Sequence, residues 1–472
     1  MVNQMSSREF DCDVAIIGGG SGGYAAARTA AGAGQRTVVV EGGREVGGLC
    51  ILRGCMPTKA LLYAAEVMRL VRHPSTWGVL NDNAGFDFAQ VMARKDRLIK
   101  EFADYRHEQL KSGAFGFIRA SARFTDNHSL VLDNGQTLTA KNFVISSGSS
   151  TAPSPLPALD EAGYLTSDTA LSLTSLPRSM IVMGGGSVAV EFAQFFARFG
   201  VKVTVVQRSE HLLREFDTDA AAELARAFRR EGIELYTGTR LLTARRDGGT
   251  KSVSFLQGDR KVHVSAEEIF LALGRVPNTA SLGLEAAGVS TERGRIITDH
   301  EMRTSAANIF AAGDCTSPYE IVHVAIQQGE IAGHNVAHPD SPRQIDYRLI
   351  TSVVFTEPQV ATVGLTEKAA RAGSVPFLAA SYPFSEHGKA LIMEAKDGFV
   401  KLLAHPENGE ILGGSCVGPM GGELIHEIIA AMYKRMTVAE LAAMPHYHPT
   451  LAEIWTYPAE ELAEKIASGK PR

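Results

Sequence analysis

Residues 13–41, DVAIIGGGSGGYAAARTAAGAGQRTVVVE, decide the fold that we expect for this chain. An apolar run that predicts a buried strand leads into a glycine-rich turn, an alanine-rich stretch that predicts a helix, and a second apolar strand. Gly18, Gly20 and Gly23 have the GxGxxG spacing, which permits a tight turn and lets the backbone approach a pyrophosphate at the helix N-terminus. By itself, such a motif is weak support for a nucleotide site.

A second copy of this pattern occupies residues 179–207, SMIVMGGGSVAVEFAQFFARFGVKVTVVQ. Gly184 and Gly186 repeat the first two glycines of the motif, and Ala189 stands in the place of the third. Two such units, each in the context of a strand, a turn and a helix, favour two dinucleotide sites over two ordinary glycine-rich turns.

The two copies differ at the end of the second strand. The first copy ends in Glu41, where a carboxylate can accept hydrogen bonds from ribose hydroxyls. The second copy has Gln207 at this position, followed by Arg208 and, further on, Arg214. Guanidinium groups without a carboxylate suit a 2′-phosphate, so we expect NADP(H) at the second site. The alternative is that both arginines are solvated surface charges.

Composition narrows the classes of protein that remain. The chain has 472 residues, of which 45% are hydrophobic and 21% charged, and a formal net charge of −5. These values are typical of a globular protein with several domains and favour neither nucleic acid nor an anionic membrane as a partner. Five cysteines are too few for a disulfide scaffold. Glycines interrupt the apolar stretch 14–33, and residues 1–13 lack the pattern of a signal peptide, so we expect a cytoplasmic protein.

A cysteine pair lies in residues 50–59, CILRGCMPTK. No further soft ligands stand nearby to complete a metal site, so none is expected, and a structural disulfide is unusual in the cytoplasm. Pro57 suits a first helical turn, which places Cys55 near a helix N-terminus that would stabilise a thiolate. For Cys50 to reach Cys55, the chain must depart from helix at Gly54. These features favour a redox-active pair.

These motifs resemble the class I pyridine nucleotide–disulfide oxidoreductases, the flavoenzyme family of dihydrolipoamide dehydrogenase, glutathione reductase and mercuric reductase. The resemblance runs nearly end to end. Besides the glycine motifs and the cysteine pair, the matching segments are ALGRVPN (272–278), TSAANIFAAGDCT (304–316), VVFTEPQVATVGLTE (353–367) and HYHPTLAE (446–453).

The resemblance implies an electron relay from NADPH through FAD to the Cys50–Cys55 disulfide. Cys55, nearer the flavin, would form a charge-transfer thiolate, while Cys50 would attack the external disulfide. His448, oriented by Glu453, would move protons, and in the family this pair comes from the partner subunit of a homodimer. The other residues implied are Lys59 and Glu191 as an ion pair near the flavin and, for cofactor binding, Gly148, Gly274 and Asp314.

The expected fold class is α/β, with two Rossmann-like dinucleotide-binding domains, for FAD and NAD(P), plus a C-terminal α+β dimerisation domain. Residues 1–150 and 275–346 are expected to form the FAD-binding domain. Residues 151–274 are expected to bind NAD(P)H, and residues 347–472 to form the interface. The Ser- and Pro-rich segment 150–157 is typical of a linker into the second domain.

The sequence leaves the disulfide substrate open. Leu49 and Leu52 replace a threonine and an asparagine that are usual in the family motif. Arg53 adds a charge that lowers a cysteine pKa, contacts an anionic substrate, or points into solvent. The retained His448 and an end without cysteines disfavour mercury, and a single matching arginine, Arg28, is weak support for glutathione. We expect a dihydrolipoamide-dehydrogenase-like enzyme, acting on lipoamide or another small disulfide, that prefers NADPH, with NADH possible.

Two alternatives come from other classes: a flavin transhydrogenase or NADPH oxidase whose cysteines are bystanders, and a noncatalytic subunit docked on a lipoyl-domain complex. Among the remaining candidates, His446 is expected to be structural. Cys12, Cys315 and Cys416 have no assigned role.

Overall fold

The computed structural model describes residues 9–81, 83–316 and 319–469. They fall into two compact units: Met1–Pro57, Ala93–Ala152 and Gly274–Asp346 in the first, and Thr58–Met92, Pro153–Leu273 and Tyr347–Arg472 in the second. The boundaries of the three expected domains stay a prediction. The expectation about a signal peptide falls mostly on residues 1–8, outside the described part. No helix in the described part is long and apolar enough to cross a membrane.

The first unit is built on parallel strands in the order β3-β2-β1-β6, with β18 also pairing with β6. Its strands are β1 (Cys12–Ile17), β2 (Thr37–Val40), β3 (Gly116–Ile118), β4 (Ala122–Phe124), β5 (Ser129–Leu132), β6 (Thr137–Ile145), β7 (Ser149–Thr151), β15 (Arg275–Pro277), β16 (Thr291–Glu292), β17 (Arg295–Ile296) and β18 (Ile309–Ala311). Its helices are α1 (Ser21–Gly32), α2 (Gly48–Leu52), most of α4 (Phe88–Lys111) and α9 (Val322–Ala337).

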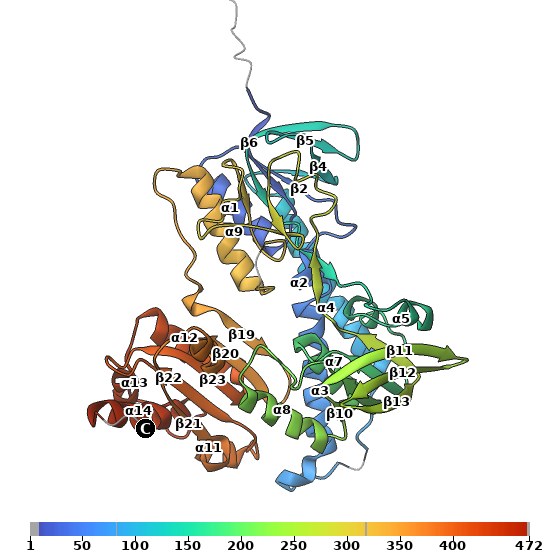
Figure 1. The fold of residues 1–472 in the computed structure, drawn as a ribbon, viewed down its shortest axis with the longest axis vertical. Helices are drawn as coiled ribbons and strands as arrows, with labels where there is room; N and C mark the ends of the chain where they lie inside the picture. The colour runs from blue at the N-terminus through green and yellow to red at the C-terminus, as the bar shows by residue number, and fades with distance from the viewer. Residues whose placement is uncertain (1–8, 82, 317–318, 470–472) are drawn as a thin grey trace, which may run out of the picture. The chain divides into compact units, whose positions relative to one another are not determined.

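Helices α1 and α9 lie side by side in this unit (Figure 1). Glycines make the approach possible: a Cβ on Gly329 would lie 2.1 Å from Gly22 O, and one on Gly333 would lie 2.5 Å from Ala26 O. Both helices also contact strands of the sheet, so the close pair fixes the position of the glycine turn in front of α1.

The second unit contains a parallel sheet of order β10-β9-β8-β14, which repeats the strand order of the first unit. Its strands are β8 (Ser179–Met183), β9 (Lys202–Val206), β10 (Glu234–Tyr236), β11 (Thr239–Asp247), β12 (Thr250–Gln257), β13 (Arg260–Ala266) and β14 (Glu268–Leu271). Its helices in this part are α3 (Cys55–Arg72, which begins in the first unit), η1 (Pro74–Trp77), α5 (Pro157–Ala162), α6 (Ser167–Ala170), α7 (Ser187–Arg198) and α8 (Thr218–Arg230).

An antiparallel sheet of order β19-β20-β23-β22-β21 completes the second unit. Its elements are η2 (Tyr347–Leu349), β19 (Thr351–Val354), β20 (Gln359–Gly364), α10 (Glu367–Ala372), β21 (Leu378–Pro383), η3 (Phe384–Glu386), α11 (Gly388–Ile392), β22 (Phe399–Ala404), β23 (Ile411–Gly418), α12 (Gly421–Tyr433), α13 (Val438–Ala443), η4 (Ala452–Trp455) and α14 (Thr456–Ala467). Trp455 is fully buried in the core under this sheet, where its indole N–H donates to Leu424 O at 3.2 Å. Two parallel sheets and a C-terminal α+β part confirm the expected fold class.

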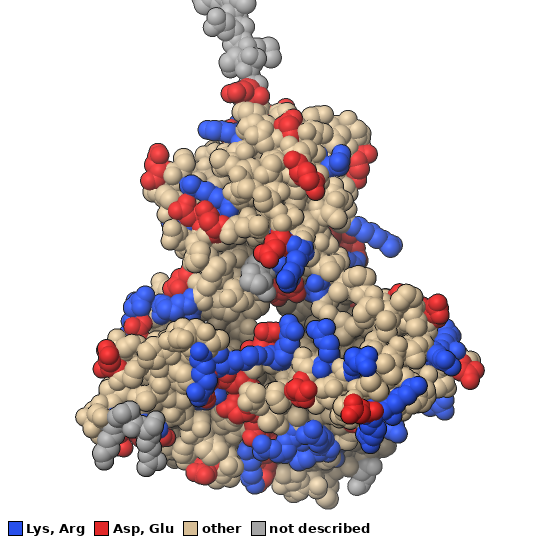
Figure 2. Space-filling view, in the orientation of Figure 1, with Lys and Arg blue, Asp and Glu red and all other residues tan. Residues whose placement is uncertain are grey.

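Charged side chains of both signs lie interspersed over much of the face drawn in Figure 2, with lysines and arginines gathered over α8. One cluster in the second unit has a buried centre, Lys401 with Asp217. The ammonium of Lys401, on β22, lies 2.7 Å from Asp219 Oδ2, 2.9 Å from Asp217 Oδ2 and 3.0 Å from Glu367 Oε1. Burial opposes ionisation of Asp217, but hydrogen bonds from Lys368 N and from Lys401 outweigh it and lower the pKa of this carboxyl.

Replacing Lys401 by methionine should leave these carboxylates without their cation and lower the free energy of unfolding by about 3 kcal/mol at neutral pH. The pKa of Asp217 is lowered in the folded protein. The stability that this carboxylate gives the wild type is therefore fully present above the pKa of the unfolded chain, which is about 4, and is lost as the pH falls through the pKa of the folded protein. Urea unfolding at fixed protein concentration, at neutral and acidic pH, measures both effects. Lys396→Met, at an exposed pair with Glu394, is the control; equal losses in both variants would contradict the prediction.

Candidate active site

The first glycine turn joins β1 to α1 and leaves no room for side chains. Gly18 has φ +105°, and a Cβ there would lie 2.3 Å from Ser146 O, while a Cβ on Gly23 would lie 1.8 Å from Gly18 O. Helix α1 follows with Gly20 as its N-cap, without a side-chain cap and without an acidic residue in its first turn. Its first backbone N–H groups are therefore available to an anion such as a pyrophosphate.

Glu41 follows β2 and is held at this turn. Its Oε2 accepts a hydrogen bond from Gly19 N at 2.8 Å, and its Oε1 accepts one from Gly43 N at 2.6 Å. Each carboxylate oxygen keeps further acceptor capacity, so the position suits ribose hydroxyls. The turn and Glu41 together fit the pyrophosphate and ribose of a dinucleotide.

Asp314 lies just beyond β18, at the same end of the sheet. Its carboxylate accepts a hydrogen bond from Ser149 Oγ at 2.6 Å, and Arg275 Nε donates to that hydroxyl at 2.8 Å. Gly148 and Gly274 flank this network with φ of +71° and +108°, which glycine adopts without strain. The structure thus brings together Asp314 and the two glycines that the resemblance assigned to cofactor binding.

The second glycine turn repeats the first. Gly184 has φ +125°, and a Cβ there would lie 2.3 Å from Ala272 O. Gln207 is buried at the end of β9, and its Oε1 accepts a hydrogen bond from Arg208 N at 3.0 Å. The Arg208 side chain is exposed, and Arg214 is exposed and pairs with its neighbour Glu215 at 2.7 Å. Because such a surface pair is weak, Arg214 is free to take another anion.

Two helices meet at the cysteine pair. Cys50 lies in α2, which ends at Leu52, and Cys55 begins α3, so the chain leaves helical geometry at Gly54 as predicted. Both cysteines are half-buried. A Cβ on Gly54 would lie 3.0 Å from Leu49 O and 3.3 Å from Cys50 Cα, which explains the glycine.

Arg53, between the two cysteines, has a partner. It forms an ion pair with Glu45 at 2.5 Å, with 43% of its side chain exposed. The structure therefore shows the charge of Arg53 paired with Glu45, and a role toward a cysteine or an anionic substrate stays a prediction.

Lys59 and Glu191 form the ion pair that the resemblance implied. Lys59 lies one turn along α3 from Cys55, and its ammonium lies 3.0 and 2.9 Å from the two oxygens of Glu191, on α7. Glu191 is nearly fully buried and also accepts a hydrogen bond from Phe355 N at 2.9 Å. The Lys59 ammonium sits 4.7 Å above the Phe355 ring, so both charges are held in place.

His448 and Glu453 also lie together. His448 Nδ1 is 3.1 and 3.0 Å from the two carboxylate oxygens of Glu453. The His448 side chain is 77% exposed, whereas that of Glu453 is 11% exposed. A largely buried carboxylate thus holds Nδ1 of an exposed imidazole, an arrangement that suits acid–base chemistry.

His446 is bound on both ring nitrogens, and the remaining cysteines are buried. His446 Nε2 lies 2.6 Å from Glu427 Oε1 on α12, and its Nδ1 lies 2.9 Å from Met444 O, which ties the loop to that helix. Burial raises the pKa of Cys12 to about 12 and also raises the pKa values of Cys315 and Cys416, so these thiols are poor nucleophiles.

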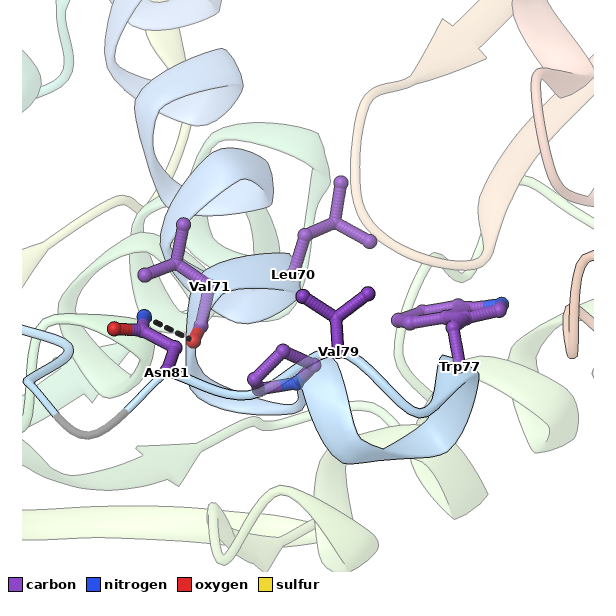
Figure 3. Close-up of a pocket in the computed structure, with 6 residues that line it drawn as sticks. Leu70, Val71, Trp77, Val79 and Asn81 are labelled. Atoms are coloured by element: carbon purple, nitrogen blue, oxygen red, sulfur yellow. Dashed lines mark hydrogen bonds between the residues drawn. The ribbon is translucent and has the colours of Figure 1, made fainter.

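A cavity of about 500 Å³ lies at the C-terminal end of α3. Figure 3 shows Leu70, Val71, Val79 and Trp77 around it, with Asn81 donating to Val71 O at 3.2 Å. Its lining has no titratable side chain, so it offers no acid–base or redox chemistry.

The fold and this site define an α/β oxidoreductase with two dinucleotide sites. Residues 12–329 match the family model described as pyridine nucleotide-disulphide oxidoreductase, and residues 350–459 match its dimerisation domain. The chain belongs to the pyridine nucleotide-disulphide oxidoreductase family.

Named relatives agree with this assignment. A dihydrolipoyl dehydrogenase of Geobacillus stearothermophilus is 35% identical, covering 98% of this chain and 97% of the relative. A mercuric reductase of Staphylococcus aureus is 32% identical, covering 95% and 82%. The crystal structure of LpdA from Mycobacterium tuberculosis superimposes with a TM-score of 0.85 at 30% identity, covering 95% of this chain and 99% of that one.

The family assignment establishes an FAD-dependent disulfide oxidoreductase that also uses a nicotinamide nucleotide. The turn at Gly18, with Glu41 and Asp314, has the features that fit FAD. The dimerisation domain supports a homodimer. One residue of this neighbourhood, His387 behind Glu453, has no signal in the sequence, because it stands outside every recognisable motif.

Proposed function

We propose that this protein is an NADPH-dependent reductase of a small disulfide of the lipoamide type, active as a homodimer. The observation that carries the proposal is the end of β9, where a buried Gln207 replaces a carboxylate and the exposed Arg208 follows it. A carboxylate here would repel a 2′-phosphate, whereas an amide beside a guanidinium attracts one. The cytoplasmic location stays a prediction.

The two cysteines carry out the proposed disulfide exchange in two steps. Bound FAD would supply the transfer of electrons from the nicotinamide nucleotide to the cysteine pair. Cys50 attacks one sulfur of the substrate disulfide, forming a mixed disulfide and freeing the other sulfur, which in lipoamide stays on the same molecule and takes up a proton. Cys55 then attacks Cys50 Sγ, which releases the second thiol and re-forms the Cys50–Cys55 disulfide.

Protons for the leaving thiols come from the histidine pair. We propose that His448 of the partner subunit faces the cysteine pair, with Glu453 holding its Nδ1. The exposed Nε2 takes the proton of Cys50 and gives it to the thiolate that leaves, within the pH range where imidazole works. The wide exposure of His448 in a single chain supports a role at a subunit interface.

The choice of lipoamide rests on relatives and on the catalytic histidine. One relative is named a dihydrolipoyl dehydrogenase and another a mercuric reductase. This chain keeps a His448–Glu453 pair, which serves thiol exchange. A lipoyl group or another small, uncharged disulfide is therefore the substrate class that we propose.

The test is anaerobic oxidation of NADPH by the purified holoenzyme with oxidised lipoamide as acceptor, beside NADH and a Cys50→Ser variant. Rapid turnover with NADPH that the variant loses is the expected result. Turnover that persists in the variant would instead indicate a transhydrogenase or oxidase. Reduction of the flavin by NADPH without lipoamide turnover would overturn the choice of substrate.

The nucleotide preference has its own test. Replacing Gln207 by glutamate together with Arg208 by alanine should reduce the NADPH-to-NADH ratio of kcat/KM by about 10- to 100-fold, because a charge-assisted contact is lost and a repulsive charge is added. Arg260→Ala, at an exposed position on β13, is the matched control. A ratio that stays the same in the double variant would show that the two residues do not read the phosphate.

A further inference from the structure

His387 lies between η3 and α11 and is completely buried. Within the described residues, neither of its ring nitrogens has a hydrogen-bond partner. Its Nε2 lies 3.4 Å from Glu453 Oε1, with an orientation that falls short of a formed hydrogen bond. Buried polar groups are rarely left unpaired, so a buried ring nitrogen directed at this carboxylate indicates a role for His387 beside Glu453.

Aromatic side chains hold the ring in place. Phe384 and Tyr457 each meet the His387 ring edge-on at 6.4 Å between centroids. Tyr457, on α14, is itself stacked on Tyr382 of β21 at 4.0 Å and 9°. Aromatic side chains of η3 and α14 thus pack against the imidazole, and its Nε2 is directed at Glu453.

The titratable groups that face His387 are Glu453, His448 and the Tyr457 ring. Burial lowers the pKa of His387, the charge of Glu453 opposes this, and His448 adds to the lowering. His387 is therefore neutral near pH 7 and keeps one N–H to donate.

Glu453 lies between the two imidazoles. Its Oε1 is 3.1 Å from His448 Nδ1 and 3.4 Å from His387 Nε2, and its carboxylate is largely shielded from water. A buried carboxylate is stabilised by each N–H that it accepts, and a second donor fixes its rotation.

We propose that His387 is a positioning residue that holds Glu453, and through it His448, in the orientation required for proton transfer in disulfide exchange. The inference rests on the proposed role of the His448–Glu453 pair. When the N–H of His387 turns onto Oε1 and donates to it, the carboxylate shares its charge between two donors. Without it, the whole charge acts on His448 and holds a proton there more tightly.

The test compares His387→Phe, which keeps a ring but no donor, with His387→Gln, whose amide N–H can replace Nε2–H. The pH profile of kcat/KM for disulfide reduction should move to higher pH by about 0.5 to 1 unit in His387→Phe and return close to wild type in His387→Gln. The ring resonances of His448, followed by NMR, should shift in the same direction. His405→Gln, outside this cluster, is the control, and His387→Met replaces the Phe variant if that one does not fold.

The Glu453→Gln variant separates the role of His387 from the proposed role of the His448–Glu453 pair. A shifted profile in Glu453→Gln with an unshifted profile and NMR titration in His387→Phe overturns the positioning role alone. Unshifted profiles in both variants overturn the proposed role of the His448–Glu453 pair as well. A shift in His387→Phe that His387→Gln does not rescue overturns hydrogen-bond donation as its cause.

Discussion

The Cys50→Ser variant is expected to lose disulfide reduction almost completely, with kcat/KM reduced by at least about 1,000-fold. The reason is chemical, because a serine hydroxyl is not ionised near neutral pH and cannot exchange with a disulfide. Apart from Cys55, the resolving thiol of the proposed exchange, the described residues offer no further thiol nucleophile, because burial raises the pKa values of Cys12, Cys315 and Cys416. Binding of FAD and of the nicotinamide nucleotide should be unchanged, because Cys50 lies on the short helix α2, outside both glycine turns.

The measurement is steady-state reduction of oxidised lipoamide, together with labelling of the reduced protein by iodoacetamide. Cys50 should be alkylated first in the wild type, and a Cys416→Ala variant should keep both activity and labelling. Cys416 is the matched control because it is buried in β23. A Cys50→Ser enzyme that still reduces the disulfide at more than a tenth of the wild-type rate would contradict the assignment of the nucleophile.

Much of the fold could be predicted because it rests on local patterns. The repeat of strand, glycine turn, helix and strand at residues 13–41 and 179–207 needs only hydrophobic periodicity and glycine spacing to be recognised. The break between α2 and α3 was also predictable, because two cysteines five residues apart cannot pair across a regular helix.

Partners from distant parts of the chain could not be predicted in the same way. Lys401 meets Asp217, Asp219 and Glu367, and the separation along the chain is already 182 residues for Asp219, so no local pattern records such a cluster. Arg53 presented an open charge in the sequence, and only the fold supplies Glu45 as its partner. Side-chain pairing depends on the packing of whole elements, which periodicity does not describe.

In the candidate site, too, local motifs could be predicted and contacts between distant residues could not. The cysteine pair and the histidine motif are short, so each could be read from a few consecutive residues. His387 belongs to neither motif and is brought to Glu453 only because η3 and α11 fold back against η4 and α14. Candidate reactive groups are therefore easier to predict from the sequence than the side chains that position them.

Replacing His448 by glutamine is expected to lower kcat/KM for disulfide reduction by about 100- to 10,000-fold, the usual contribution of a general acid–base. The amide cannot exchange a proton, so the pH dependence between about pH 5 and 8 should flatten at the same time. His446→Gln is the matched control, because His446 is bound to Glu427 and is expected to be structural. Equal losses in the two variants would show that the loop, and not the His448 proton, is needed.

Hybrid dimers test whether the histidine acts across the subunit interface. A dimer of one Cys50→Ser chain and one His448→Gln chain contains one complete site if Cys50 works with His448 of the partner subunit, and none if both residues act within one chain. Isolated heterodimers, tagged differently on each chain, should therefore recover about half of the wild-type activity, although each parent homodimer is inactive. Heterodimers as inactive as their parents would place the proton donor and the nucleophile in the same chain, and would overturn the proposed dimeric site.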